Sequence, residues 1–407
     1  MRDDRSRLDV GKLLAAVEDA PPVAAADAVG DQLAQMLGAS EVALLIADFS
    51  GEALIRLGHA GSSAATRTQG RETAQSLPLT GTAEGRALAK QGVEVERGPD
   101  SWLLLAPVTN RGEAIGVLEL HFADEPDEQC VADAALAAHA LAYIVIANRR
   151  FTDLFEWGQR SVSLSLAAEI QHRLLPGAYT CEAGQFSLAG WLEPAGEIAG
   201  DTFDFSLDRD FLHLSMTDAM GHGIEASVLA TVLVGALRNG RRAGVTIAEQ
   251  AERANAGLAK HTRDGEFVTG QLARIDLGRG SATIVNAGHP PPLRLRDGVV
   301  THIELEADPP FASFERHSYR EQPLELMPGD RLLFLTDGML ERNAAKVDTA
   351  SLLVQSASMH PREAVQHLIR ALREATGGEL QDDATVMCVD WLGGPPRPRT
   401  SDAGADY

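Results

Sequence analysis

The stretch FLHLSMTDAMGHGIEASVLATVLVGAL, from Phe211 to Leu237, has the pattern of a strand, a turn and a helix in immediate succession. Apolar residues recur among polar ones up to Asp218, which predicts a strand that ends in a carboxylate. The glycines of AMGHG predict a tight turn after it. From Ile224 to Leu237 almost every residue is apolar, which predicts a buried helix. An acidic side chain is thereby expected between a strand end and a glycine turn.

Hairpins and helices are expected on both sides of this stretch. Thr246 opens a helix through a capping box with Glu249, and a further helix ends at Gly377. Asp297-Gly298 is a strong signal for a type I′ turn. The expected hairpins join strands 203–207 with 211–218, 271–277 with 282–287, and 293–296 with 299–303. The chain from Pro176 onward is therefore expected to form a layered α+β domain.

The N-terminal part has a different pattern. Helical spacing from Ala24 to Leu37 precedes a buried strand beginning at Val42, and LLLAPVTNRGEAIGVLEL predicts two strands joined near Arg111. Asp127 to about Leu175 is helical with few breakers. This segment is either a connector between domains, the interpretation we favour, or a surface helix of its own domain. The expected boundaries are a lead-in (1–18), a first domain (19–148), a connector helix (149–175), a second domain (176–393) and a disordered tail (394–407).

Composition excludes several classes of protein. The chain has 407 residues, and 36 Lys+Arg against 58 Asp+Glu give a net charge of −22, so we expect no binding to nucleic acid or to an anionic membrane. The three cysteines fit neither a disulfide framework nor a zinc site. The charged start is no signal peptide. The charge-free stretch Ala134 to Asn148 has fifteen residues, too few to span a bilayer. We expect a cytoplasmic protein.

Aspartates border predicted strands at four places, Asp201, Asp218, Asp337 and the pair Asp382–Asp383. Each could simply stabilise a turn. Because each adjoins an apolar strand and a glycine, a turn or a second aspartate, we expect the set to converge. Converging carboxylates repel one another unless a cation lies between them. All-oxygen ligands suit Mg²⁺ or Mn²⁺ better than zinc.

Five motifs in order, PAGEIAGDTFDF, DAMGHGIEAS, NAGHPPPLR, LTDGMLE and DDATV, resemble those of the SpoIIE-type branch of the metal-dependent protein phosphatases, the PPM family. The resemblance extends from Pro176 to about Trp391. It implies an α-β-β-α sandwich with two Mn²⁺ or Mg²⁺ ions at one edge. A water shared between two cations about 3.5–4 Å apart loses its proton readily and attacks phosphorus in line.

The same resemblance implies a role for each acid. Asp218 would bridge the two ions, and Asp337 and Asp382 would complete one ion site, which makes these three the catalytic set. Asp201 and the backbone carbonyl of Ala219 would help to hold the second ion. Asp383 would be a further metal-site neighbour. Because all these acids are present, we expect an active enzyme.

Two departures from the family pattern concern loops. Ala199 replaces the first glycine of a GGD motif, which is tolerable unless its φ is positive. ADPPFASFE, residues 307–315, replaces a glycine-containing loop. His222 is either a proton donor to the leaving oxygen or, as we favour, part of the glycine turn. His289 is expected to stabilise a turn rather than to bind metal.

The first domain resembles a GAF sensor module, which leaves open a small-molecule or protein signal and a purely structural dimerisation role. SLAAEIQHRLLP, from Ser165 to Pro176, resembles the helix that opens SpoIIE-type catalytic domains and can switch their metal site. In that case the first domain and the connector would control metal affinity.

Together the resemblances imply a serine/threonine protein phosphatase that acts on a phosphorylated STAS-type anti-sigma-factor antagonist in a partner-switching pathway. The connector makes a homodimer the expected state. One alternative is a catalytically silent scaffold that binds a signalling partner. Another is a different two-metal hydrolase, such as a phosphodiesterase, although we find no nucleotide-recognition residues for it.

Overall fold

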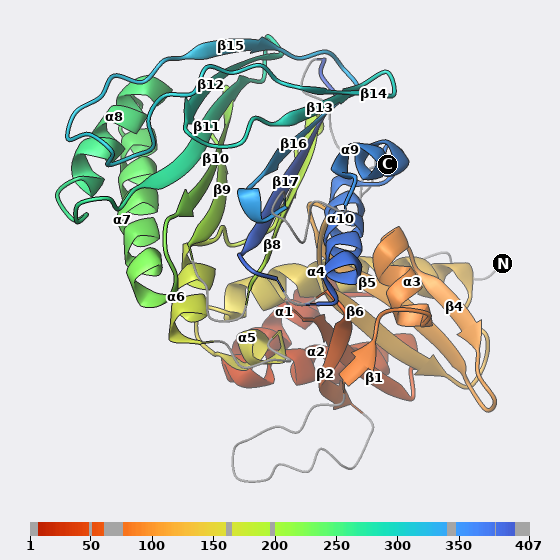
Figure 1. Ribbon diagram of the computed structural model, residues 1–407. Coiled ribbons are helices and arrows are strands. Elements are labelled where there is room, and N and C mark those ends of the chain that lie inside the picture. Colours follow the sequence, from red (N-terminus) through yellow and green to blue (C-terminus); the bar gives the residue numbers. More distant parts are fainter. Residues whose placement is uncertain are drawn as a thin grey trace. The chain divides into compact units, whose positions relative to one another are not determined.

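The computed structural model describes residues 7–48, 51–60, 76–159, 165–195, 200–339, 347–378 and 380–394. The chain divides into two compact units (Figure 1). The first comprises Met1–Ser163 with Thr400–Tyr407, and the second comprises Leu164–Arg399.

The first unit is built on one antiparallel sheet with strand order β3-β2-β1-β6-β5-β4. The strands are β1 (Glu41–Ala47), β2 (Ala53–Ala60), β3 (Ser76–Pro78), β4 (Glu94–Arg97), β5 (Trp102–Asn110) and β6 (Glu113–Phe122). One face packs against α1 (Val10–Asp19), α2 (Ala25–Leu37) and α4 (Glu128–Asn148), with the turn η1 (Pro22–Ala24) before α2. The other face packs against α3 (Ala83–Lys90). The predicted hairpin near Arg111 is confirmed as β5–β6, whereas the GAF assignment stays a prediction.

The expected connector is not one continuous helix. After α4 the chain forms a short helix α5 (Leu154–Gly158), and α6 (Leu166–Leu174) begins beyond the undescribed residues 160–164. Phe155 of α5 is completely buried in the apolar core of the first unit. A Cβ at Gly158 would lie 2.7 Å from a methyl carbon of Leu57, so glycine permits this close approach. The chain therefore turns back onto its own unit after α4, because the aromatic side chain is buried there.

Helix α4 is also longer than the charge-free stretch in the sequence. Asp127 caps it by accepting the Cys130 N–H, and Asp133 inside it is buried and accepts the Arg7 N–H. Among the described helices it is the one with the length and apolarity of a membrane span, with a mean hydropathy of 1.9. Half of that window is buried inside the protein.

The second unit is a sandwich of two antiparallel sheets, with strand orders β15-β12-β11-β10-β9 and β14-β13-β16-β17-β8-β7. The first sheet comprises β9 (Asp201–Leu207), β10 (Phe211–Ala219), β11 (Val268–Asp276), β12 (Ser281–Ala287) and β15 (Gln322–Glu325). The second comprises β7 (Thr180–Glu182), β8 (Phe186–Glu193), β13 (Leu293–Arg296), β14 (Val299–His302), β16 (Asp330–Leu335) and β17 (Ala384–Trp391).

Helices cover both outer faces of the sandwich. Helices α7 (Gly223–Arg242) and α8 (Ile247–Leu258) pack on the first sheet, and α9 (Thr349–Gln355) and α10 (Pro361–Thr376) pack on the second. A separate apolar core, which includes Phe203, Phe334 and Trp391, fills the space between the sheets. The expected α-β-β-α sandwich is confirmed.

Local predictions in this unit hold with one exception. The capping box of Thr246 is present, and Asp297 and Gly298 both have the positive φ that a type I′ turn requires. The prediction of a buried helix after the glycine turn was wrong for one face. Ile224 and Val228 are 50% and 49% exposed, because α7 lies on the outside of the sandwich and only one face meets the sheet.

Candidate metal centre

Strand pairing places Asp201 and Asp218 side by side. They are direct partners in the antiparallel pair β9–β10, so their side chains lie on the same face of the sheet. Next to them the Ala219 N–H donates to the Gly200 carbonyl at 3.2 Å. A Cβ at Gly200 would lie only 2.5 Å from the Ala219 carbonyl oxygen. A residue without a side chain is therefore needed at position 200 for the two strand ends to meet.

The second sheet contributes its acids from two neighbouring strand ends. β16 leads through Thr336 into the turn η2 (Asp337–Met339), and Asp382 and Asp383 directly precede β17. A Cβ at Gly338 would lie 2.0 Å from the Asp383 carbonyl oxygen, so the two segments approach backbone to backbone. The pairing of β16 with β17 thus brings Asp337 close to Asp383.

Two threonine hydroxyls join the sheets at this edge. Thr336 Oγ1 and Thr385 Oγ1 each donate to Asp201 Oδ2 at 2.7 Å. Thr336 Oγ1 in turn accepts the Thr385 N–H at 2.9 Å. The carboxylate of the first sheet is therefore held in place by the second sheet, and one of its two oxygens is committed to these hydrogen bonds.

The acids raise one another's proton affinity. Burial raises the pKa of Asp218 to about 7, and the charges of Asp337 and Asp382 act in the same direction. Burial also raises the pKa of Asp201 well above its ordinary range, with further contributions from Asp218 and Asp383. Burial raises the pKa of Asp383 to about 6, although hydrogen bonds from the Ala195 N–H and from Gln171 oppose the shift. The group is thus costly to ionise without a cation.

No described Lys or Arg side chain forms an ion pair with Asp201, Asp218, Asp337 or Asp383. Within the described ranges, no three His, Cys, Asp or Glu side chains form a closed set able to hold an ion by themselves. A hard cation such as Mg²⁺ keeps several waters and needs only a few carboxylates. The oxygen-only donors and the raised pKa values fit such an ion, completed by water and a backbone oxygen such as that of Ala219.

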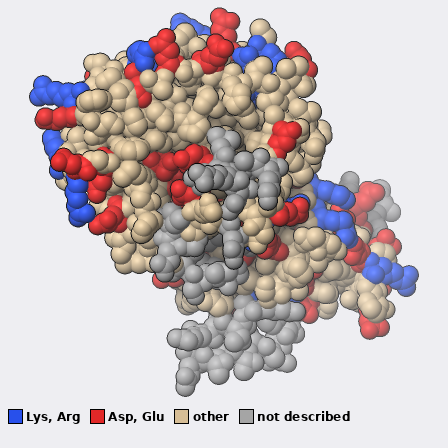
Figure 2. Space-filling model, in the orientation of Figure 1, with Lys and Arg blue, Asp and Glu red and all other residues tan. Residues whose placement is uncertain are grey.

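Exposure shows from which side a substrate can reach the acids. Asp201 and Asp383 are 2% and 1% exposed, whereas Asp337 is exposed and Asp218 and Asp382 are half-buried. The innermost carboxylates are thus shielded from water, and the outer ones face it. On the face drawn in Figure 2, the described Lys and Arg side chains are scattered among acidic ones and form no broad basic patch.

Comparisons with known proteins agree with this geometry. The sequence profile described as stage II sporulation protein E (SpoIIE) matches residues 208–392. The phosphoserine phosphatase RsbU of Bacillus subtilis is 21% identical over 232 residues, which are 56% of this chain and 69% of RsbU. The phosphoserine phosphatase RsbP of the same organism is 26% identical over 187 residues, which are 45% of this chain and 46% of RsbP. Residues 208–392 belong to the SpoIIE family. The second unit is accordingly a serine/threonine protein phosphatase domain of the PPM class.

Solved structures with a similar chain path are known. The RsbU and RsbW domains of Rv1364c from Mycobacterium tuberculosis share 27% identity, with a TM-score of 0.46 over 53% of this chain and 63% of that chain. The PP2C phosphatase domain of SpoIIE from Bacillus subtilis, with a fragment of its regulatory domain, shares 16% identity, with a TM-score of 0.47 over 76% of this chain and 84% of that chain.

The two histidines considered in the sequence analysis, His222 and His289, differ in burial. His289 is 4% exposed, its N–H donates to Asn286 Oδ1, and its ring lies 2.8 Å from the Thr269 hydroxyl. Burial lowers its pKa to about 4, so it is a neutral turn residue near pH 7. His222 is exposed and makes no side-chain capping bond at the start of α7. The turn is shaped instead by Gly221 and Gly223, which have positive φ.

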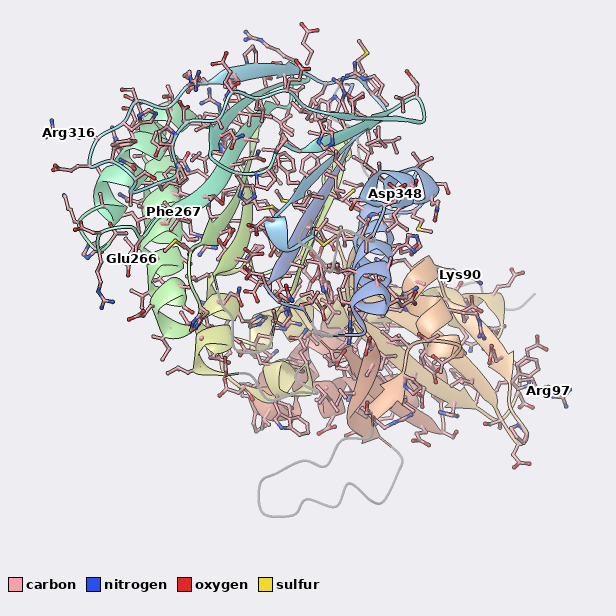
Figure 3. The ribbon with its side chains drawn as sticks, in the orientation of Figure 1. Lys90, Arg97, Glu266, Phe267, Arg316 and Asp348 are labelled. Atoms are coloured by element: carbon pink, nitrogen blue, oxygen red, sulfur yellow. The ribbon has the colours of Figure 1, made fainter. Side chains whose placement is uncertain are left out.

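The loop after Ala219 is fixed from outside the motif. The Met220 N–H donates to the carbonyl of Phe267, a residue next to Glu266 in the segment before β11 (Figure 3).

The two departures from the family pattern concern Ala199 and the loop 307–315. Ala199, whose φ decides whether it can replace the first glycine of a GGD motif, lies outside the described residues. In the 307–315 loop, Ala312 has a φ of 68°, a conformation that favours glycine, and its N–H donates to Asn255 Oδ1.

Sequence reasoning missed the residues that support the acids. Gln171 of α6 is buried and donates through Nε2 to the Asp201 carbonyl at 2.9 Å and to Asp383 Oδ2 at 2.6 Å. Thr336 and Thr385 hold Asp201 from the other sheet. All three lie inside segments recognised in the sequence, IQHRLLP, LTDG and DDATV. The sequence therefore located these three residues but did not show which groups they would form hydrogen bonds with.

Proposed function

We propose that this protein hydrolyses phosphoserine or phosphothreonine in a protein substrate with two Mn²⁺ or Mg²⁺ ions bound at the Asp201–Asp218–Asp337–Asp382 edge. One observation carries the proposal: carboxylates from two sheets converge there, and burial together with neighbouring carboxylates raises the pKa of Asp201, Asp218 and Asp383. Bound ions would neutralise phosphoryl charge and lower the pKa of a water molecule.

The chain's own residues have separate tasks in this proposal. Asp218, Asp337 and Asp382 would supply carboxylate oxygens to the ions, which would activate a water molecule and neutralise phosphoryl charge. Asp201 is held through one oxygen by its two threonine donors, which leaves its other oxygen as the one that would bind an ion. Asp383 positions α6 through Gln171. His222 is exposed beside the turn, and we propose it only as a candidate proton donor to the leaving seryl oxygen.

The proposed substrate is a phosphorylated STAS-type anti-sigma-factor antagonist in a partner-switching pathway. The motif order and the similarity to the phosphoserine phosphatases RsbU and RsbP support this choice. The phosphatase domain would span residues 176–393.

Regulation would act through α6. Besides the two hydrogen bonds of Gln171, the Ala167 carbonyl accepts from Ser227 Oγ of α7 at 3.3 Å, and the Leu174 carbonyl accepts from Arg238 Nη2 at 2.6 Å. Any shift of α6 would therefore disturb the support of Asp201 and Asp383. We propose that the GAF-like domain, residues 19–148, and the segment 149–175 set the pose of α6 and thereby metal affinity.

Turnover of p-nitrophenyl phosphate and of a phosphoserine peptide, with and without Mn²⁺, tests the activity. Asp218→Asn is expected to reduce Mn²⁺-dependent turnover about a thousandfold, since metal stabilisation of the transition state is worth several kcal/mol. Asp210→Asn is the matched control, because Asp210 lies at the opposite end of the same hairpin and is exposed. Equal activity of wild type and Asp218→Asn would contradict the proposal.

A truncated chain distinguishes an inactive phosphatase domain from one that the first unit inhibits. If the full chain is silent, residues 161–407 are tested alone, since the second unit is compact by itself. Activity that appears on deletion would support control by the first unit. Silence of the folded fragment would favour the scaffold alternative. Normal activity of the fragment at limiting Mn²⁺, equal to that of the full chain, would contradict the proposed regulation.

A further inference from the structure

The NAGHPP turn is fixed by backbone groups, without the help of the His289 ring. The His289 N–H donates to Asn286 Oδ1 at 2.9 Å, and the Pro290 carbonyl accepts from Gln271 Nε2 at 2.8 Å. Gly288 has a φ of 67°, a conformation that favours glycine. His289 is nevertheless only 4% exposed. Because burying a polar ring is costly unless it forms hydrogen bonds, the ring is expected to serve another group.

The ring of His289 reaches a hydroxyl beside a metal-site acid. Its Nδ1 lies 2.8 Å from Thr269 Oγ1. Thr269 of β11 is the direct antiparallel partner of Asp218 of β10, and Asp218 is the direct partner of Asp201 of β9. Side chains of directly opposite residues lie on the same face of a sheet, with Cβ atoms about 4.5–5.5 Å apart. Asp201, Asp218 and Thr269 therefore form a row across three strands, and His289 contacts the end of that row.

The hydrogen bond between His289 and Thr269 has a defined direction. Burial lowers the pKa of His289 to about 4, so near pH 7 the ring is neutral and carries one proton. The Leu335 carbonyl lies close enough to the ring to act on its pKa, although Nε2 forms no well-aligned hydrogen bond within the described residues. A carbonyl oxygen only accepts, which favours the proton on Nε2 and leaves Nδ1 as an acceptor. The Thr269 hydroxyl then donates to Nδ1, and its oxygen keeps its acceptor positions.

An acceptor beside Asp218 has a specific use in a centre made of carboxylates. Hard cations such as Mg²⁺ keep several waters, and groups outside the direct ligands orient what binds the ion. Thr269 Oγ1 can accept from such a water while its own hydrogen is held by His289. Without the ring, that hydrogen would be free to donate to Asp218 and to compete with an ion for the same carboxylate.

We propose that His289 is a positioning residue of the metal centre, which holds the Thr269 hydroxyl as a donor to Nδ1 so that Thr269 Oγ1 accepts from a water of an ion bound at Asp218. This role rests on the proposed function, because it concerns the same ions. A purely structural ring would behave differently, since its loss would lower stability and leave the affinity for the ion unchanged.

Direct Mn²⁺ binding to the full chain, measured by electron paramagnetic resonance of the free ion, tests this role without a substrate. Thr269→Val keeps the β-branched shape but removes the hydroxyl, and it should weaken Mn²⁺ binding about tenfold. Thr269→Ser restores a hydroxyl and should bind nearly as the wild type does. Thr217→Val is the matched control with unchanged affinity. Thr217 is buried, its hydroxyl lies 2.6 Å from that of Thr202, and it precedes Asp218 on the opposite face of β10.

A double-mutant cycle tests whether His289 acts through Thr269. His289→Leu should also weaken Mn²⁺ binding about tenfold, and His289→Leu/Thr269→Val should bind no more weakly than Thr269→Val alone. His289→Asn, whose Oδ1 can accept from the Thr269 hydroxyl in place of Nδ1, should recover most of the affinity. Circular dichroism melting curves show which variants fold, and Thr269→Val with Thr269→Ser decides the matter if His289→Leu does not. Losses that add up in the double variant would overturn positioning through Thr269.

Nitrogen NMR of the imidazole gives a readout that is independent of the ions. In the metal-free wild type, His289 should carry its proton on Nε2, and the Nδ1 resonance should shift when Thr269→Val removes its donor. A proton on Nδ1 would overturn the assigned direction. Unchanged Mn²⁺ affinity of a folded Thr269→Val would overturn the inference and leave the proposed function intact, whereas a wild type that binds no Mn²⁺ would contradict both.

Discussion

The two units treat buried carboxylates in opposite ways. In the first unit Glu119 is 3% exposed, and Arg56 donates to both of its oxygens at 2.8 Å. Burial alone would raise the pKa of Glu119, but hydrogen bonds from His121 and Arg56 lower it below its ordinary value. In the second unit, burial and neighbouring acids raise the pKa of Asp201 and Asp218. The first carboxylate has its cation within the chain, and the others have none among the described residues.

The second unit itself contains a buried carboxylate that is paired with cations, Asp204. Asp204 lies on the same strand as Asp201 and is also buried, yet Arg238 and Arg241 both bind it at 3.0 Å. Burial by itself therefore does not distinguish a structural acid from a metal ligand. The distinguishing feature is a shared edge where several acids meet and where Asp201 and Asp218 have no cationic partner among the described residues, which leaves room for an external cation.

The largest expected effect is on the pH dependence of stability. Without metal, the folded protein keeps protons on acids such as Asp218, whose pKa rises from 3.8 to about 7, after the unfolded chain has lost them. The free energy of unfolding should thus fall as pH rises from about 4 to about 7, by about 1.4 kcal/mol per pH unit for each proton involved. Urea titrations in EDTA, followed by hydrogen exchange in β9 and β10, measure this fall.

Two controls sharpen that measurement. Asp218→Asn should flatten the profile, and saturating Mn²⁺ should reverse it, because the ion favours the ionised acids. Glu119, with its lowered pKa, should contribute stability that is lost only as pH falls below about its ordinary value of 4.5. A metal-free second unit whose stability rises between pH 4 and 7 would remove the contrast between the units.

The next effect concerns the support of the acids. Gln171→Ala removes the hydrogen bonds to Asp201 and Asp383 and should raise the Mn²⁺ concentration for half-maximal activity about ten- to a hundredfold. Activity at saturating Mn²⁺ should stay close to that of the wild type. Gln185→Ala is matched, since Gln185 is also buried and donates to two carbonyls, those of Leu277 and Gly394. An equal shift in both variants would assign the effect to packing alone.

A smaller effect is expected in the first unit. Glu119→Gln removes the nearer of the two carboxylates beside Arg56, the other being Glu41 at 3.9 Å. It should lower the free energy of unfolding by about 1–3 kcal/mol, toward the lower end because Arg56 is partly exposed and keeps Glu41. The exposed pair Arg86–Glu96 gives the control, with less than about 1 kcal/mol expected for Glu96→Gln. Denaturant unfolding measures both. A stabilising Glu119→Gln would make Glu119 resemble the acids of the second unit.

The smallest effect concerns strain rather than charge. Ala312 has a φ of 68°, and Ala312→Gly should raise the free energy of unfolding of the second unit by about 0.5–1 kcal/mol, as relief of the strain outweighs the greater freedom of the unfolded chain. Its Mn²⁺ requirement should not change. A changed requirement in a folded variant would show that the loop, and not only the acids, controls metal binding.

Sequence reasoning was accurate where the information is local. Strand ends at Asp218 and Asp337, the turn at Asp297-Gly298 and the capping box at Thr246 follow from short-range preferences, and the structure has them. The continuous connector failed, because burial of Phe155 in the first unit depends on residues far away in the chain. The fully buried helix α7 failed for the same reason, since only the sheet decides which face is covered.

The sequence by itself determined which acids exist, where each one leaves its strand, and the order of motifs that defines the family. Only the tertiary structure decided that Asp201 and Asp218 are direct partners across two strands, that hydroxyls of the other sheet hold Asp201, and that the buried His289 ring meets Thr269. The physical reason is that turns and strand ends depend on neighbouring residues, whereas burial, charge compensation and proton affinity depend on groups that folding brings together from distant parts of the chain.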